Sequence, residues 1–302
     1  GVSGAAPDAN LAGLRLISCS LSDSREANAL GHENQIIDIY SNSWGPSDGG
    51  NTLEAPGPLM MAAFEDDTAN GRGGLGNIIT WAAGNGLSND DDSNKDGYAN
   101  SRHTIAVTAI THYGDQSWYA EPGSNILIAA HSDGDGEGIT TTDIEGSSGY
   151  TNNDYTDDFG GTSSATPLAS GVIALILEAN ANLTWRDVQH ILVHSARMNH
   201  PSSSSWNVNG AGHDVSHKYG FGAIDAGAAV ALAENWTNVD QAVNITSGTR
   251  VVSQSIPDDT NTPLTDTYTV IDQLQVEHVE VVVNIDHNYR SDLVITLTSP
   301  VG

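Results

Sequence analysis

One short segment brings together residue types that suit nucleophilic catalysis. Two glycines precede Thr162 and Ser163, and an apolar run from Leu168 to Leu177 follows them. The glycines allow a tight bend and the close approach of a substrate. We expect a buried helix to begin here, because its free N–H groups and positive dipole end would lie beside the Ser163 hydroxyl, where an oxyanion would form. The alternative is that these hydroxyl residues only cap a helix.

A second segment, residues 77–86, supplies a candidate partner for that oxyanion. It is typical of a buried strand that ends in a turn of small residues carrying Asn85. A side-chain amide at the end of a strand can donate a hydrogen bond to a developing oxyanion. Asn before Gly is also the commonest pattern of an ordinary turn, so these residues alone leave both interpretations open.

The elements that must position these residues alternate along the chain. Apolar runs predict buried strands, and helical patterns lie between them. We expect strands at 11–17, 36–40, 78–81, 104–110 and 126–129, and helices at 24–32, 59–69, 165–179, 185–196 and 225–236. Such alternation indicates an α/β fold, a mostly parallel sheet with helices on both faces. Long polar loops at 88–100 and 132–158 interrupt it.

The pattern changes after Trp236. Apolar and polar residues then alternate as in half-buried strands, at 250–256, 266–271, 276–285 and 293–299. We therefore expect a first domain at residues 1–236 and a partial all-β sandwich or jelly-roll domain at 237–302.

Composition narrows the class of partner. The 302 residues include 38 acidic and 10 basic ones, which gives a formal net charge of −28. Such a charge repels nucleic acid and anionic membranes and attracts basic peptides, although most of it can also be an adaptation of the surface to solubility or salt. Cys19 is the single cysteine, so we expect no internal disulfide and a buried, apolar role for it. No signal peptide or membrane span is predicted within the chain, and a membrane anchor elsewhere is left open.

Several motifs in a consistent order carry a resemblance to a known family. They are A-G-N-G at 83–86, G-T-S-x-A-x-P at 161–167, S-W-G-P at 43–46 followed by Asp48, D-G-Y at 96–98, 183–190, 218–226 and, for a second module, 291–302. The chain resembles the kexin/furin-like (proprotein convertase-type) branch of the subtilisin superfamily over essentially its whole length. The resemblance implies a subtilisin-like serine protease domain followed by a P (Homo B) domain.

The resemblance also implies roles at the candidate site. Ser163 would be the nucleophile, and Asn85 would stabilise the oxyanion together with the backbone N–H of Ser163. The family also needs an Asp and a His that precede the Ser, with the His before Gly-Thr. None of the 11 histidines is followed by Gly-Thr, and residues 1–7 resemble the stretch shortly after that His. We therefore expect a fragment of a protease that lacks the catalytic Asp and His and is not competent alone.

Proteases of this branch cleave after Lys or Arg, usually paired. A buried cation needs anionic partners in a water-poor pocket. By resemblance Asp48 and Asp96 line that pocket, and the remaining substrate-binding positions are Glu54, Glu26 and Tyr98 along the groove and the backbone of Ser43, Trp44 and Gly45, which would pair with an extended peptide. Glu54 stands where the family commonly has Asp, which changes the reach of that carboxylate.

Calcium is the cofactor that the resemblance implies. Ca²⁺ takes six to eight oxygen ligands, which acid-rich loops supply. Asp48, Asp91 and Glu121 match a family calcium site beneath the specificity pocket. Ser93 and Lys95 stand where the family often has the two cysteines of a disulfide, so we expect calcium to order this loop.

The expected partners are peptides or proteins with basic residues, with a propeptide or chaperone as a further candidate, and no nucleic acid. The expected location is secreted or cell-surface, in a bacterium. Two other functions stay open: a subtilase of broad specificity, and a catalytically inactive pseudoprotease that binds basic peptides. An unrelated α/β hydrolase is disfavoured, because such enzymes carry the motif G-x-S-x-G, whereas this chain has Ala165 in place of the last glycine.

Overall fold

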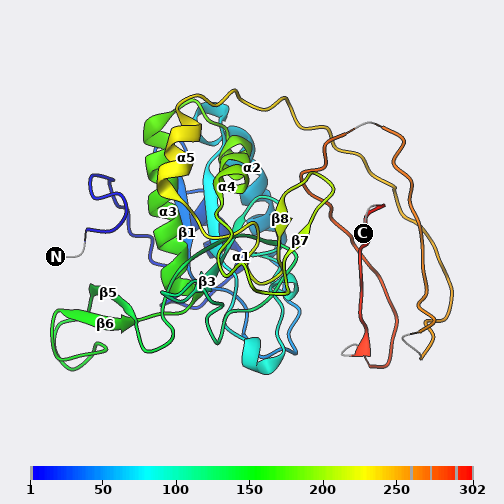
Figure 1. Cartoon of the computed structure of the whole chain (residues 1–302), viewed down its shortest axis with the longest axis horizontal. Helices are drawn as coiled ribbons and strands as arrows, with labels where there is room; N and C mark the ends of the chain where they lie inside the picture. Colours follow the sequence, from blue (N-terminus) through cyan, green and yellow to red (C-terminus); the bar gives the residue numbers. More distant parts are fainter. Residues whose placement is uncertain (1–2, 259–260, 273, 290–291, 301–302) are drawn as a thin grey trace. The chain divides into compact units, whose positions relative to one another are not determined.

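The structure, a computed structural model, describes residues 3–258, 261–272, 274–289 and 292–300 (Figure 1). Contacts divide the chain into two units, Gly1–Asn238 with Asp286–Gly302, and Val239–Ile285. The elements are α1 (Asp23–Leu30), β1 (Ile39–Asn42), α2 (Pro58–Gly74), β2 (Ile78–Ala82), two 3-10 turns η1 (Leu87–Asn89) and η2 (Ser93–Lys95), β3 (Ile105–Ile110), β4 (Ile126–His131), β5 (Ile139–Thr142), β6 (Tyr155–Phe159), α3 (Thr162–Ala179), α4 (Trp185–Ser195), β7 (Asn207–Val208), β8 (Asp214–Val215) and α5 (Ala226–Ala233).

The larger unit is built on a four-stranded parallel sheet in the order β1-β2-β3-β4. Ile39 pairs with Ile78, Thr80 with Ile105, and Val107 with Ile128. Every residue of β2 and β3 is buried, as expected for strands covered on both faces. Because all four strands run in one direction, their carboxyl ends meet at one edge of the sheet, where α/β proteins place their ligands.

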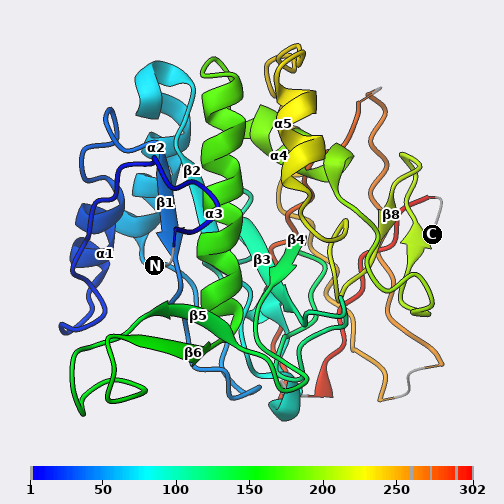
Figure 2. The same ribbon diagram turned by 60° about the vertical axis from the view of Figure 1, so that its left-hand side comes forward.

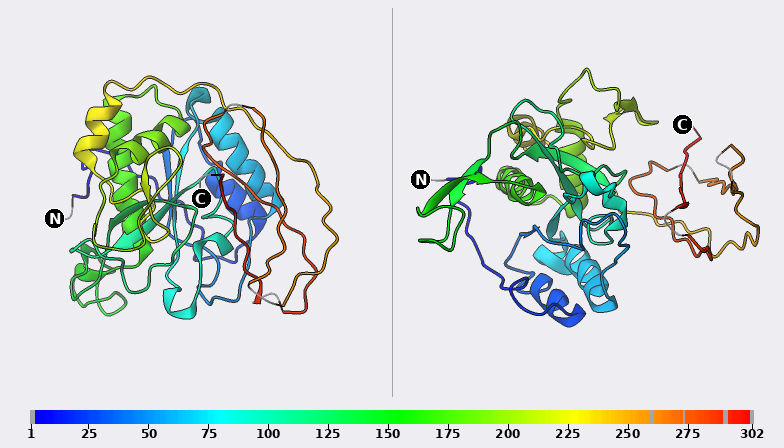
Figure 3. Two further views of the ribbon diagram at one scale, coloured as in Figure 1. Left: turned by 45° about the vertical axis from the view of Figure 1, so that its right-hand side comes forward. Right: turned by 90° about the horizontal axis from the view of Figure 1, so that it is seen from below.

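Helices cover both faces of this sheet, which confirms the predicted α/β class. Ile78 packs in one core cluster with residues of α3, α4 and α5, whereas its neighbour Ile79 packs in another with residues of α1 and α2. Figure 2 shows α3 crossing in front of the strands, and Figure 3 shows α1 and α2 side by side. Alternate side chains of one strand therefore enter opposite layers of the core.

Helix α3 begins three residues before the predicted start, at Thr162. Gly161 caps it with φ +79° and ψ 172°, a backbone conformation that favours glycine. This is also the helix that is long and apolar enough to cross a membrane among the described residues, with half of that stretch buried. Its packing in the core cluster explains that apolar character.

Three expectations for the first domain were wrong. Residues 11–17 form no strand, and Leu11 and Ile17 are 97% and 63% exposed, because no described strand pairs with them. The segment 132–158 is not a plain loop, since it contains most of the antiparallel β5–β6 hairpin. Cys19 is half-exposed rather than buried.

The β pattern of the C-terminal part was also predicted in more detail than the structure bears out. The described residues of 250–256, 266–271, 276–285 and 293–299 lie in no strand, and Val282 is 97% exposed. A segment of alternating apolar and polar residues is stable as a strand only when it pairs with a neighbouring strand and its apolar face is covered. The described residues of these segments meet neither condition. Ser291, Val301 and Gly302 of the motif at 291–302 lie outside the described residues.

Candidate active site

Three segments converge on the turn before α3. Ser43 follows β1, Asn85 lies shortly after β2, and Ser132 follows β4 directly. The Ser43 hydroxyl donates to the Ser163 carbonyl oxygen at 3.0 Å, and the Ser132 hydroxyl donates to the Gly161 carbonyl oxygen at 2.7 Å. The predicted nucleophile and its neighbours therefore lie at the carboxyl edge of the sheet.

Ser163 is half-buried and is the second residue of α3. Its hydroxyl has no hydrogen-bond partner among the residues that the structure describes, and none of the 11 histidines contacts it through a hydrogen bond. Its backbone N–H belongs to the first turn, where N–H groups lack partners within the helix. The site thus offers a hydroxyl and a helix N-terminus, and within the described ranges no side chain hydrogen-bonds this hydroxyl as a general base would.

Asn85 lies directly against the nucleophile turn. Its Oδ1 accepts from the Thr162 N–H at 2.8 Å and from the Thr162 hydroxyl at 3.0 Å. Its Nδ2 points to Asp48 Oδ2 at 3.4 Å. A long hydrogen bond to Asp48 uses one N–H of the amide group, which leaves the second N–H for a substrate oxygen.

The predicted specificity acid Asp96 lies beneath Gly45. A Cβ atom at Gly45 would be 2.8 Å from Asp96 Oδ2, so a larger residue at this position would require the Asp96 carboxylate to shift. Burial raises the pKa of Asp96 to about 6; the N–H groups of Tyr98 and Ala99 lower it, and the charge of Asp48 raises it again. A carboxylate that is costly to ionise without a partner is well suited to bind a cationic side chain.

Tyr98 connects this region to Glu26. The buried Tyr98 hydroxyl donates to Glu26 Oε2 at 2.8 Å, and Glu26 is only 7% exposed. The Tyr98 ring lies 5.1 Å from the rings of both Trp44 and Trp81. Glu26 is therefore a buried acid, held in place by Tyr98 rather than free in solvent.

Glu54, in contrast, is exposed. Its backbone forms a parallel bridge with Asp96, in which the Gly97 N–H donates to the Glu54 carbonyl oxygen at 2.8 Å. The structure thus brings Asp48, Asp96 and Glu54 into one acidic region.

The three predicted calcium ligands line one small cavity. Asp48, Asp91 and Glu121 surround a space of about 20 Å³ together with Asp96 and Lys95. That volume is enough for one water-sized species. Burial raises the pKa of Glu121 to about 8; the Gly86 N–H lowers it, and the charge of Asp91 raises it again. As they lie, however, no three acidic, His or Cys side chains in the described ranges form a ready metal site.

Lys95 contributes a cation to this cavity that the sequence did not lead us to expect. Its ammonium group donates to the carbonyl oxygens of Gly50 at 2.9 Å and Asp90 at 3.2 Å, and lies 3.5 Å from Asp91 Oδ1. Lys95, which stands where the family often has a cysteine, therefore connects the loop 90–96 to Gly50 through a charged hydrogen-bond donor.

The sequence analysis also missed Asp133 and Tyr119, which hold the turn directly before Ser163. Asp133 Oδ1 accepts from the Gly161 N–H at 2.8 Å, and the buried Tyr119 hydroxyl donates to the same carboxylate. A signal was present, because Ser132 and Asp133 follow the predicted strand 126–129 within four residues, and the observed β4 ends directly before Ser132.

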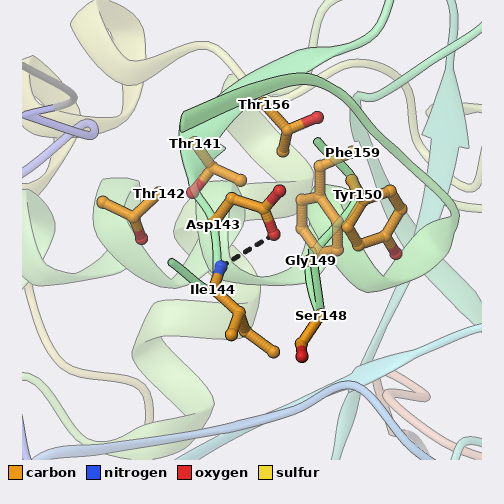
Figure 4. A pocket seen from close by; sticks show the side chains of 9 residues that line it. All are labelled: Thr141, Thr142, Asp143, Ile144, Ser148, Gly149, Tyr150, Thr156 and Phe159. Carbon is orange, nitrogen blue, oxygen red and sulfur yellow. Dashed lines mark hydrogen bonds between the residues drawn. The ribbon is translucent and has the colours of Figure 1, made fainter. Parts of the chain in front are cut away.

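A second, larger hollow lies on the β5–β6 hairpin and involves none of the predicted residues. It has a volume of about 540 Å³, and Figure 4 shows the Tyr150 and Phe159 rings on one side of it. Asp143 in this hollow accepts from the Ile144 N–H at 2.8 Å and the Thr151 N–H at 2.8 Å, so its carboxylate serves the local turn.

Comparisons with known proteins agree with this architecture. The model of the Subtilase family matches residues 1–222, and that of the Proprotein convertase P-domain matches 276–302. Furin of Rattus norvegicus is 40% identical over 99% of this chain, which spans 38% of furin. Proprotein convertase subtilisin/kexin type 6 of Rattus norvegicus is 42% identical over 99% of this chain and 32% of that protein.

Among solved structures, a serine protease of Aeromonas sobria matches with a TM-score of 0.70 at 26% identity, over 81% of this chain and 53% of that one. The same protease in complex with a chaperone matches with a TM-score of 0.67 at 25% identity, over 77% and 50% of the two chains. The chain thus spans less than two fifths of the curated relatives that it matches. The family match and the geometry around Ser163 agree: this chain belongs to the subtilase family of serine proteases.

Proposed function

We propose that this chain carries the nucleophile and the specificity pocket of a calcium-dependent serine endopeptidase that cleaves after basic, usually paired, residues. The observation that supports this most is the pair of hydrogen bonds that join Ser163 to Ser43 and the adjacent Thr162 to Asn85. Residues 1–236 would form the catalytic domain and residues 237–302 part of the P domain.

In this mechanism Ser163 Oγ would attack the scissile carbonyl carbon as a base takes its proton; the peptide C–N bond would then break, the amine would leave with that proton, and an acyl-enzyme would remain. The Ser163 N–H and an Asn85 N–H stabilise the oxyanion, and loss of one such donor lowers kcat by about 10²–10³-fold, a magnitude that comes from subtilisin of the same superfamily. The reaction needs a histidine base oriented by an aspartate, and no residue of this chain is assigned to either role. Without them Ser163 is a weak nucleophile at neutral pH.

Recognition of a basic side chain would rest on Asp96, which lies near Gly45, and on Asp48, which lies near Asn85. Glu54 and Glu26 with Tyr98 would hold basic residues further from the scissile bond. The backbone of Ser43, Trp44 and Gly45 would pair with the extended peptide.

Calcium would be held by Asp48, Asp91 and Glu121 after small movements of their side chains. When bound, it would neutralise carboxylates that now raise one another's cost of ionisation. Such loops suit the calcium concentrations found outside cells, which is consistent with a secreted or cell-surface protein. A bacterial origin stays a prediction, as does a propeptide or chaperone partner.

A binding assay tests recognition on the chain as it exists. Fluorescent peptides that end in Arg-Arg, Ala-Ala or Phe-Phe are titrated against the wild type, Asp96→Asn and Glu65→Gln, an exposed acid of α2. We expect the Arg-Arg peptide to bind at least about tenfold more tightly than the others, and only Asp96→Asn to remove the difference. Equal binding of all three peptides would contradict basic specificity and favour the broad-specificity subtilase.

A second assay tests catalysis with the purified full-length gene product that contains this chain. We expect turnover of an Arg-Arg substrate that Ser163→Ala abolishes. One observation favours the alternative of a basic-peptide-binding pseudoprotease, namely that no histidine hydrogen-bonds the Ser163 hydroxyl in the part of the chain that the structure describes. Tight binding of Arg-Arg without any turnover by the full-length product would decide for that alternative.

A further inference from the structure

The nucleophile turn is held from several sides at Gly161. Asp133 Oδ1 accepts from the Gly161 N–H at 2.8 Å, and the Ser132 hydroxyl donates to the Gly161 carbonyl oxygen at 2.7 Å. Asn85 Oδ1 accepts from the next N–H group, that of Thr162, at 2.8 Å. Both peptide groups that flank Gly161 are therefore fixed in orientation immediately before Ser163.

The Asp133 carboxylate is itself anchored. The Tyr119 hydroxyl donates to Asp133 Oδ1, and the Ser117 hydroxyl donates to the Asp133 carbonyl oxygen at 2.8 Å. Tyr119 is 4% exposed, and burial raises its pKa to about 12, so its hydroxyl keeps its proton at neutral pH. Asp133 is thus held by contacts other than its bond to the turn.

The backbone at Gly160 lies very close to the Asp133 carboxylate. A Cβ atom at that position would overlap the Asp133 carboxylate, so the backbone passes directly over the acid. A hydrogen bond from an N–H to a carboxylate is about twice as strong as one between neutral groups. A single anionic acceptor is therefore able to hold Gly161 in its unusual conformation, with φ +79°.

We propose that Asp133 is a positioning residue that sets the orientation of the turn 160–163 and, through it, of the Ser163 hydroxyl and N–H. It does not touch the substrate; it acts through the Gly161 peptide group. The catalytic meaning of this inference rests on the proposed function, whereas its structural part, the ordering of the turn, does not.

Three variants separate positioning from general stability. Asp133→Ala removes the acceptor, Asp133→Asn keeps an oxygen acceptor without the charge, and Glu137→Gln removes one exposed charge from the same loop. The readout on the chain as it exists is amide hydrogen exchange of residues 159–165. We expect exchange at least about tenfold faster in Asp133→Ala at a temperature where all variants are folded. Asp133→Asn should restore most of the protection, and Glu137→Gln should match the wild type.

In the full-length gene product we expect Asp133→Ala to lower kcat by about 10–100-fold with KM within about twofold of the wild type, because the substrate pocket is untouched. Unchanged exchange of residues 159–165, or unchanged kcat in an active enzyme, would overturn the inference. An inactive wild type overturns the proposed function instead, and the exchange result then decides alone whether Asp133 orders the turn.

Discussion

The hydroxyl of Ser43 donates a hydrogen bond to the carbonyl oxygen of Ser163 at 3.0 Å. In an ordinary helix that carbonyl would accept from the N–H of the residue four positions later. That residue is Pro167, which has no N–H. The proline thus leaves the carbonyl oxygen of Ser163, the proposed nucleophile, free to accept, and the Ser43 hydroxyl directly after β1 donates to it, which ties α3 to the sheet at the site.

This relationship predicts a coupling between Ser43 and Pro167. Ser43→Ala should destabilise the wild type by about 1–2 kcal/mol, because a half-buried carbonyl loses its donor. In a Pro167→Ala background the new N–H group can bond to the Ser163 carbonyl, so the same change should cost less than about 0.5 kcal/mol. Denaturant unfolding of the four proteins measures the coupling. Identical costs in both backgrounds would show that Ser43 acts through some other contact.

The affinity for a basic peptide should depend on pH through Asp96. Burial raises the pKa of this carboxyl to about 6. The ionised form attracts a cation, so affinity for an Arg-Arg peptide should rise as pH increases from about 5 to 7 and level off above. Fluorescence titration across this range measures it, and Asp96→Asn should flatten the curve. A wild-type curve that is already flat would argue against Asp96 as the anionic partner.

Lys95 should reduce the dependence of the chain on calcium. Its ammonium group already neutralises part of the cavity that Asp91 and Glu121 line. Lys95→Met removes that charge, so it should lower Tm in the presence of a chelator and should increase the rise in Tm that millimolar calcium produces. Thermal unfolding with calcium or chelator measures both effects. Lys218→Met, at an exposed lysine, is the matched control.

The wild type should itself unfold at a lower temperature with chelator than with calcium. If neither the wild type nor Lys95→Met responds to calcium, Asp48, Asp91 and Glu121 do not form a calcium site in this protein.

Asp67 should make the fold less stable as pH rises. This acid of α2 is fully buried, its Oδ2 has no hydrogen-bond partner among the described residues, and burial raises its pKa to about 7. A pKa above that of the unfolded chain means that the folded state binds more protons, so stability is greatest at low pH and falls between about pH 4 and 7.

Asp67→Asn should remove this part of the pH dependence, whereas Asp66→Asn, at its exposed neighbour, should leave it in place. Urea unfolding at pH 5 and pH 8 measures the difference. A fall in stability of the same size in Asp67→Asn as in the wild type would assign the dependence to other groups.

The sequence by itself determined the class of the fold and the family, and it predicted the turn before Ser163 as the site of the nucleophile. Burial of β2 and β3 and the helical periods of α2, α3 and α4 are local patterns, and they were predicted to within a few residues. The motifs around Ser163 and Asn85 led to the subtilase family, which the comparison over residues 1–222 then showed. Patterns failed where a strand needs a neighbour, as at 11–17, because pairing is a property of two segments.

Only the tertiary structure decided which side chains hold the site in place. Tyr119 and Asp133 are ordinary residues in the sequence, yet they meet at the back of Gly161. Lys95 is a charged loop residue until the fold sets its ammonium group against Asp91. Such contacts depend on the order and register of parallel strands, which bring together residues far apart in the chain. Local sequence records the residue types at strand ends, but not which ends become neighbours.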